Sequence, residues 1–121
     1  MQDQELVLQL ASFLYDKKAQ DIVVLKVSHL TVLCDYLVIA SGRTVNQVSS
    51  LTDLADDFMA QRSMHLRRSE GSHEGRWAVL DYGNIMVHLF HREDRAYYGL
   101  DRLWNDGTNL LALPFDQSVQ D

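Results

Sequence analysis

The stretch RWAVLDYGNIMVHLFHREDRAYYGLDRLW, residues 76–104, decides the fold of this chain. Residues 76–81 and 84–90 are two apolar runs rich in β-branched residues, and Tyr82-Gly83 stands between them. A glycine in a two-residue loop is typical of a β-hairpin. The stretch therefore predicts two antiparallel strands joined at Tyr82 and Gly83.

The predicted hairpin has two distinct faces, because side chains alternate across a strand. Its register places Asp81 opposite Asn84, Val79 opposite Met86 and Trp77 opposite His88. One face is apolar throughout: Ala78, Leu80, Ile85, Val87 and Leu89. The other, here called the mixed face, carries Trp77, Val79, Asp81, Asn84, Met86, His88 and Phe90. Either a helix covers the mixed face or the face is a recognition surface, where Trp and Met are enriched. The pattern by itself favours burial, because core positions outnumber contact positions in a small domain.

Length and charge limit the class of protein. The chain has 121 residues, enough for one domain with one core, and 46% of them are hydrophobic, which excludes a disordered chain. Seventeen acidic and eleven basic residues give a net charge of -6. This balance argues against nonspecific binding to DNA or other nucleic acid, and it favours a basic partner.

The cysteine content and the N-terminus predict a soluble, cytoplasmic protein. Cys34 is the single cysteine, so no internal disulfide forms, which is typical of a reducing compartment. The N-terminal residues MQDQELVLQL are acidic and lack the basic region of a signal peptide. No apolar run reaches the roughly 18 residues that a membrane span needs.

Periodicity and capping predict the remaining elements. Helices are expected over residues 3–18, from Thr44 to about residue 62, over 92–98 and over 100–104, and further strands over 22–27, 36–40 and 64–68. Thr44 and Gln47 stand in the spacing of a capping box, and Gly99 ends the third helix. The expected fold is α/β: a single domain, residues 1–104, with one mixed sheet of about five strands flanked by helices. Residues 105–121 form a C-terminal tail that either packs back or stays mobile.

Three catalytic sites are each only partly present in the sequence. Ser41-Gly42 after a strand is similar to the entry of a phosphate-binding turn, although a simple turn explains it as well. A nucleotidyltransferase needs paired carboxylates on a strand, whereas Asp81 stands alone and Asp56-Asp57 lies on a predicted helix. A triad of Asp81, His88 and Ser41 lacks the sequence around a nucleophilic serine.

Metal and thiol chemistry have no better support in the sequence. The five histidines show no spacing of a structural zinc site. Asp35 beside Cys34 raises the pKa of a thiol, which favours a packing role for this cysteine.

Three motifs together resemble the ribosomal silencing factor family, also called Iojap-like proteins. They are DYLVIASGRTVNQV at residues 35–48, GRWAVLDYGNIMVHLF at 75–90 and YYGLDRLW at 97–104. The resemblance implies a small α/β protein with nucleotidyltransferase-like topology, without known catalysis, cofactor or metal. It also implies binding to large-subunit ribosomal protein fourteen, steric blocking of subunit association, repression of translation under nutrient limitation, and a homodimer when free. Lys26, Cys34 and Asn84 depart from the family pattern, and the change at Asn84 removes negative charge from the expected contact.

With this resemblance, a recognition surface becomes the favoured interpretation of the mixed face, ahead of burial under a helix. The expected partner-binding residues are Trp77, Asp81, Tyr82, Asn84, Met86 and His88. Trp77 is the expected anchor, and Asp81 is expected at the charged rim. Two alternatives stay open: an enzyme that uses the nucleotidyltransferase-like topology, and a dimeric scaffold whose mixed face is only a homodimer contact.

Overall fold

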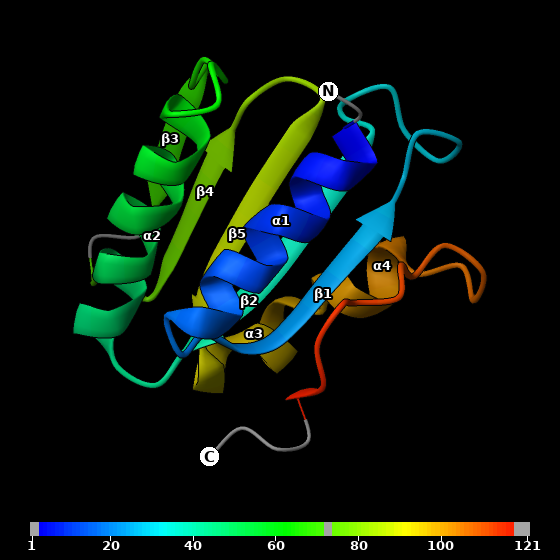
Figure 1. Cartoon of the computed structure of the whole chain (residues 1–121). Helices are drawn as coiled ribbons and strands as arrows, with labels where there is room; N and C mark the ends of the chain where they lie inside the picture. Colours follow the sequence, from blue (N-terminus) through cyan, green and yellow to red (C-terminus); the bar gives the residue numbers. More distant parts are fainter. Residues whose placement is uncertain (1–2, 72–73, 118–121) are drawn as a thin grey trace.

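The fold is a five-stranded mixed sheet, seen in a computed structural model that describes residues 3–71 and 74–117 (Figure 1). The strands are β1 (Gln20–Lys26), β2 (Tyr36–Gly42), β3 (Arg68–Gly71), β4 (Trp77–Asp81) and β5 (Ile85–His91). Their order is β1-β2-β5-β4-β3; β2 and β5 are parallel, and the other neighbours are antiparallel. The predicted fold class is confirmed.

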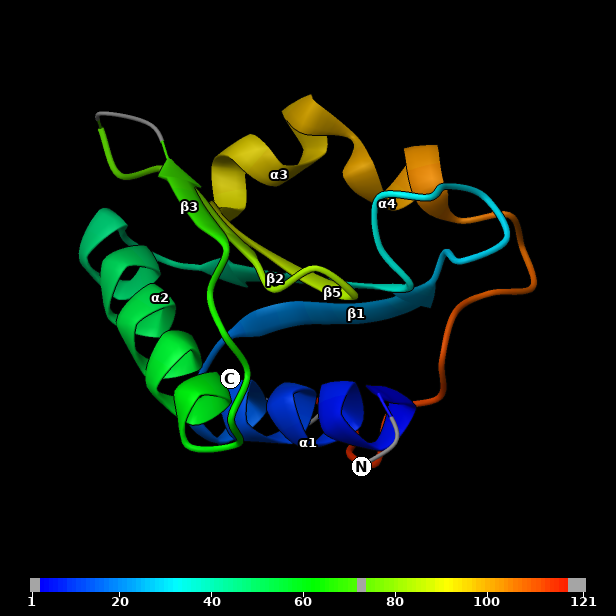
Figure 2. The same ribbon diagram turned by 90° about the horizontal axis from the view of Figure 1, so that it is seen from above.

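Helices cover both faces of the sheet (Figure 2). The helices α1 (Asp3–Asp16) and α2 (Val45–Ala60) pack on one face, and α3 (Arg92–Tyr98) and α4 (Leu100–Trp104) lie on the other. Each face has its own apolar core. The larger core joins α1 and α2 to the apolar face of the hairpin, including the fully buried Leu89. No helix within the described ranges is long and apolar enough to cross a membrane.

Local capping sets the ends of two helices where the sequence predicts them. Thr44 has an extended backbone, and its hydroxyl accepts a hydrogen bond from the Gln47 N–H at 3.0 Å. The Gln47 side chain reaches back one residue farther than in a regular capping box and accepts from the Arg43 N–H at 2.6 Å. Gly99 ends α3 with a φ of 66°, a conformation that glycine adopts without a Cβ clash.

The hairpin register differs from the predicted one by two residues. Trp77 pairs with Phe90 instead of His88, and Asp81 pairs with Met86. The turn residues are Gly83, with a φ of 88°, and Asn84, in place of Tyr82 and Gly83. A positive φ at the first turn position matches the twist of the strands, and this position suits glycine. Because the shift is even, the division into two faces is preserved along β4 and β5.

The edge strand β3 begins later than the predicted strand over residues 64–68, which is wrong in position. Ser63 ends the α2 region with a φ of 63°, and Met64 then packs against the larger core. The chain therefore uses residues 64–67 to return from the helix to the sheet, where Arg67 N–H donates to the Asp81 carbonyl at 2.7 Å. The predicted end of β2 at residue 40 is also wrong, because Ser41 and Gly42 continue the strand beside β5.

The tail packs along the outer edge of β1 (Figure 1). Asn109 accepts from the Lys26 N–H at 3.0 Å, and Leu111 donates to the Val24 carbonyl at 2.9 Å. The Gln117 side chain bonds both backbone groups of Ile22, at 2.6 and 3.0 Å. The tail thereby covers an edge that would otherwise expose unpaired backbone groups. The division into residues 1–104 and 105–121 stays a prediction.

Candidate partner-binding surface

The mixed face lies on the α3–α4 side of the sheet. On β4 and β5 it carries Trp77, Val79, Asp81, Met86, His88 and Phe90. On β3, Arg68 stands opposite Asp81 and Glu70 opposite Val79, so these two charged side chains extend the face to the sheet edge. Both are exposed, and an ion pair joins them with an N–O distance of 3.7 Å.

An aromatic row runs across the mixed face. The ring centroid of Trp77 lies 6.3 Å from that of Phe90 and 6.5 Å from that of His88. Trp77 is half-buried, and it packs against the smaller core. A packed aromatic residue that is not fully buried is suited to anchor an interface.

Helix α4 covers one end of the mixed face, and an apolar cavity of about 190 Å³ lies beneath the helix. Met86 and His88 form its sheet side, and Leu100 and Trp104 of α4 line it as well. Burial lowers the pKa of His88 from 6.5 to about 4. Among the described residues, the buried His88 Nδ1 has no hydrogen-bond partner. His88 is therefore neutral at pH 7 and sits on this face as an apolar group.

Two segments that border this cavity, the loop before β2 and α4, carry exposed apolar side chains, here called the apolar rim: Val32, Leu33 and Leu103. Their exposed fractions are 101%, 71% and 67%. Leu33 also lines the cavity, which joins the loop before β2 to α4. Exposed apolar groups on neighbouring segments are typical of interaction surfaces. The sequence pattern predicts only a connection for this loop, and the apolar run Leu30–Cys34 is the signal that points to an exposed apolar segment.

The structure brings together three of the six predicted partner-binding residues: Trp77, Met86 and His88. Asp81 lies half-buried where β4 ends, and its carboxylate accepts from the Gly83 N–H at 2.8 Å, as its turn-flanking position predicts. It stands at one end of the mixed face.

The side chains of the remaining two predicted residues, Tyr82 and Asn84, lie off the mixed face. Tyr82 is buried in the larger core, and its hydroxyl donates to Asp56 of α2 at 2.7 Å. Burial, with Asp56 second, raises the pKa of this phenol. Asn84 was expected on the mixed face, but its side chain donates to Asp3 of α1 at 2.9 Å, which corrects that placement. The alternation of side chains between the two faces ends where the strand ends, so it does not predict the direction of the Asn84 side chain in the turn.

The considered catalytic residues are not assembled into a site. Ser41 is buried in β2, and its hydroxyl accepts from the Arg95 guanidinium at 3.0 Å. Ser41 pairs with Phe90, whereas Asp81 pairs with Met86, so the two are separated along β5. Burial, and then Asp35 and Asp81, raise the pKa of the Cys34 thiol to about 11, which leaves it protonated at pH 7. Within residues 3–71 and 74–117, no three His, Cys, Asp or Glu side chains are grouped to hold a metal ion.

The comparison with known proteins decides the family. The family model described as "Ribosomal silencing factor during starvation" matches residues 1–121. The chain belongs to the ribosomal silencing factor family. The resemblance of the three motifs is thereby confirmed.

Relatives and solved structures agree with this family. The ribosomal silencing factor of Halalkalibacterium halodurans is 32% identical over 106 residues, which cover 88% of this chain and 91% of that protein. A crystal structure of a protein from Chromobacterium violaceum matches with a TM-score of 0.82 and 27% identity, covering 99% of this chain and 98% of that one. The mouse protein named "Mitochondrial assembly of ribosomal large subunit protein 1" is 28% identical over 102 residues, 78% of this chain and 43% of its own length.

Proposed function

We propose that this ribosomal silencing factor binds large-subunit ribosomal protein fourteen and sterically blocks association of the two ribosomal subunits. Translation is thereby repressed under nutrient limitation. The observation that carries the proposal is the partly exposed Trp77 on a mixed face that continues toward an apolar rim, in a member of this family. The name of the mouse relative, which refers to the large subunit, supports the choice of subunit.

The net charge of -6 supports a basic ribosomal protein as the partner, in preference to exposed ribosomal RNA. In the free state we propose a cytoplasmic homodimer. The mechanism needs no catalytic step: the bulk of the bound factor occupies the surface that the small subunit approaches.

Co-sedimentation with purified subunits tests the choice of partner. The factor should pellet with large subunits and stay in the supernatant with small subunits. Equal binding to both, or binding to neither, would contradict the proposal. Cross-linking then identifies which large-subunit protein lies against the factor, and a cross-link that consistently avoids protein fourteen would reject that assignment.

The order of addition tests the mechanism. An occluding factor should inhibit translation when it is added before the subunits associate, and preformed ribosomes should be largely resistant. Inhibition should also saturate near one factor per large subunit. An enzyme behaves differently, because trace amounts would inactivate an excess of ribosomes.

Substitution of Trp77 tests the surface. Trp77→Ala should weaken large-subunit binding by about 2–4 kcal/mol, or roughly thirtyfold to a thousandfold, as loss of a central aromatic anchor does. Asp81→Ala should cost less, and its effect should shrink in high salt, because a rim charge is screened.

Stability measurements separate a contact from a core position. Trp77 is half-buried, so we expect Trp77→Ala to lower the melting temperature as well. Leu33→Ser removes an apolar group that is 71% exposed and should weaken binding without this loss of stability. Leu66→Ser, at a residue 38% exposed outside the mixed face and the apolar rim, serves as the matched control. Normal binding by folded Trp77→Ala and Leu33→Ser proteins would remove this surface from the proposal.

A further inference from the structure

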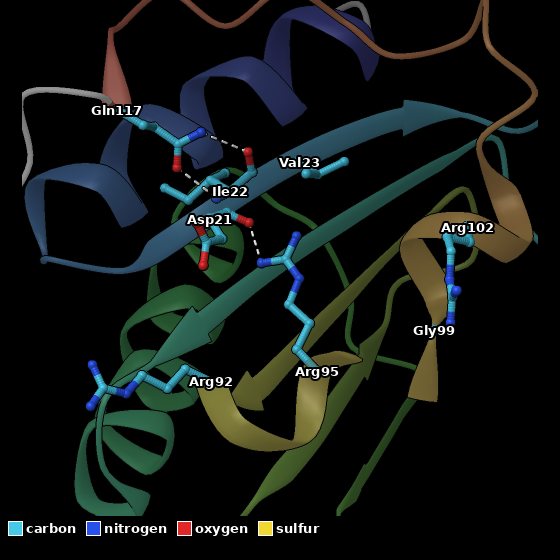
Figure 3. Close-up of a pocket in the computed structure, with 8 residues that line it drawn as sticks. All are labelled: Asp21, Ile22, Val23, Arg92, Arg95, Gly99, Arg102 and Gln117. Atoms are coloured by element: carbon cyan, nitrogen blue, oxygen red, sulfur yellow. Dashed lines mark hydrogen bonds between the residues drawn. The ribbon is translucent and has the colours of Figure 1, made fainter. Parts of the chain in front are cut away.

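A second cavity, of about 670 Å³, lies between β1 and the α3–α4 pair (Figure 3). Three arginines line it: Arg92 and Arg95 from α3, and Arg102 from α4. Its other wall is β1, at the opposite end of the strand order from β3. The cavity is therefore separate from Trp77 on β4.

The lining of this cavity is basic, although the chain as a whole is acidic. Three of the eleven basic residues line it, in a protein with a net charge of -6. The acidic residues of α3 face another partner: Asp94 accepts two hydrogen bonds from Arg76, at 2.7 and 2.9 Å, and Glu93 lies 3.7 Å from the same guanidinium. Among the described lining residues, Asp21 is the one carboxylate, so the cavity keeps a positive balance.

Arg95 is built into the wall. It is 9% exposed, and its guanidinium donates to the Asp21 carbonyl and to the Ser41 hydroxyl. An irregularity in β1 between Gln20 and Val23 leaves Asp21 outside the ladder, with a φ of 51°, where its carbonyl accepts from Arg95. Figure 3 shows Arg95 reaching from α3 to β1. These hydrogen bonds fix the Arg95 guanidinium against β1 and β2.

Arg92 and Arg102 stand on either side of Arg95 and are exposed (Figure 3). In the part of the chain that the structure describes, neither side chain makes an ion pair or a hydrogen bond, and the hydrogen bond of Arg102 to the Gly99 carbonyl comes from its backbone N–H. Their guanidinium groups can bind an incoming anion without first breaking an internal contact. Guanidinium groups suit phosphate oxygens in particular, because their planar donors match two oxygens at once.

We propose that this cavity binds a small phosphate-bearing anion with more than one phosphate group, of about the size of a nucleotide. The volume lies within the range of small-molecule sites, roughly 300–1,000 Å³. The spread of the three arginines favours a ligand with several phosphates over a single phosphate ion. The acidic surface of the rest of the molecule disfavours an extended RNA strand, which needs a continuous basic surface.

Because α4 lines both cavities, the fluorescence of its Trp104 can report ligand binding in the arginine-lined cavity. Arg102 belongs to the same five-residue helix as Trp104, which lines the apolar cavity on its other side. A ligand held by Arg102 should change the surroundings of Trp104 and hence its fluorescence.

The experiment titrates the full chain with inorganic pyrophosphate, and separately with ATP, at constant ionic strength. Calorimetry follows both ligands, and tryptophan fluorescence follows pyrophosphate, which does not absorb. Binding should be saturable, and sodium chloride at equal ionic strength should not reproduce it. Arg92→Ala and Arg102→Ala should each raise the Kd about three- to tenfold, and Arg102→Lys should recover part of the loss.

Arg68→Ala is the matched control, because it removes one exposed arginine on β3 at the far edge of the sheet. It should leave the Kd of pyrophosphate unchanged. Arg102→Ala should still co-sediment with large subunits, so failure of the anion site is distinguishable from failure of the proposed function.

Three results would overturn the proposal. The first is the absence of saturable pyrophosphate and ATP binding up to millimolar concentration. The second is an equal loss of pyrophosphate binding in Arg68→Ala. The third is a single-stranded oligoribonucleotide that binds more tightly than ATP and loses this binding in Arg102→Ala, which would assign the cavity to an RNA backbone instead.

Discussion

Protonation of His88 should destabilise the fold in mildly acidic solution. Burial lowers the pKa of this imidazole in the folded protein to about 4, whereas its ordinary value is 6.5. The folded state therefore resists a proton that the unfolded state accepts. Above pH 6.5 the free energy of unfolding keeps the full contribution of the neutral imidazole. This contribution is lost as the pH falls below 6.5, and the loss levels off near pH 4. Since one pKa unit corresponds to about 1.36 kcal/mol, the loss from pH 7 to pH 5 should be about 2 kcal/mol.

The measurement is urea unfolding of the wild type and of His88→Leu at pH 7, 6 and 5. Leucine removes the titrating group and suits the site, because the surrounding cavity is apolar and Nδ1 has no hydrogen-bond partner among the described residues. The two proteins differ at this one residue, so the difference between the two pH profiles isolates His88. The wild type should lose about 2 kcal/mol more than the variant between pH 7 and pH 5.

Identical pH profiles for the two proteins would refute this reasoning. They would mean that the imidazole keeps its ordinary pKa in the fold, with water reaching the ring. A profile in which the wild type gains stability toward pH 5 would reverse the sign and require an acidic partner for His88.

Three further substitutions test the packing around the site by urea unfolding at pH 7. Tyr82→Phe should cost about 1.5–3 kcal/mol, because it removes a part-buried hydrogen bond to a charged carboxylate. Tyr15→Phe, which removes an exposed bond to a backbone carbonyl, should cost less than about 1 kcal/mol, and equal costs would contradict the buried role of Tyr82. Asn109→Ala should cost about 1–3 kcal/mol, because its buried amide donates to two backbone carbonyls; an unchanged stability would show that the tail adds nothing to the fold.

Much of the secondary structure could be predicted from the sequence because its causes are local. Thr44 begins α2 and Gly99 ends α3 through hydrogen bonds and φ values set within a few residues. The two faces of the hairpin follow from side-chain alternation, and the buried Leu80, Val87 and Leu89 match the predicted apolar face. Family membership was also predictable, because three motifs match in combination.

The positions of β3 and of the hairpin turn depended on distant contacts. Met64 packs on the larger core before the chain reaches the sheet, and this delays β3 to Arg68. The turn at Gly83 and Asn84 follows from a strand pairing that aligns β4 with a β5 already held beside β2. The β-strand propensity of a few neighbouring residues does not determine where β3 begins or where the hairpin turns.

The candidate site shows the same division between local pattern and tertiary packing. Sequence alternation placed Trp77, Met86 and His88 together on one side of the sheet, and the structure agrees. Only the packing of α4 decided that His88 is covered while part of Trp77 is not. Burial of a side chain depends on which distant element lies over it, and side-chain periodicity reports only which side of a strand it occupies. For the same reason the arginine-lined cavity, formed by β1 and α3 from opposite parts of the chain, could be found only in three dimensions.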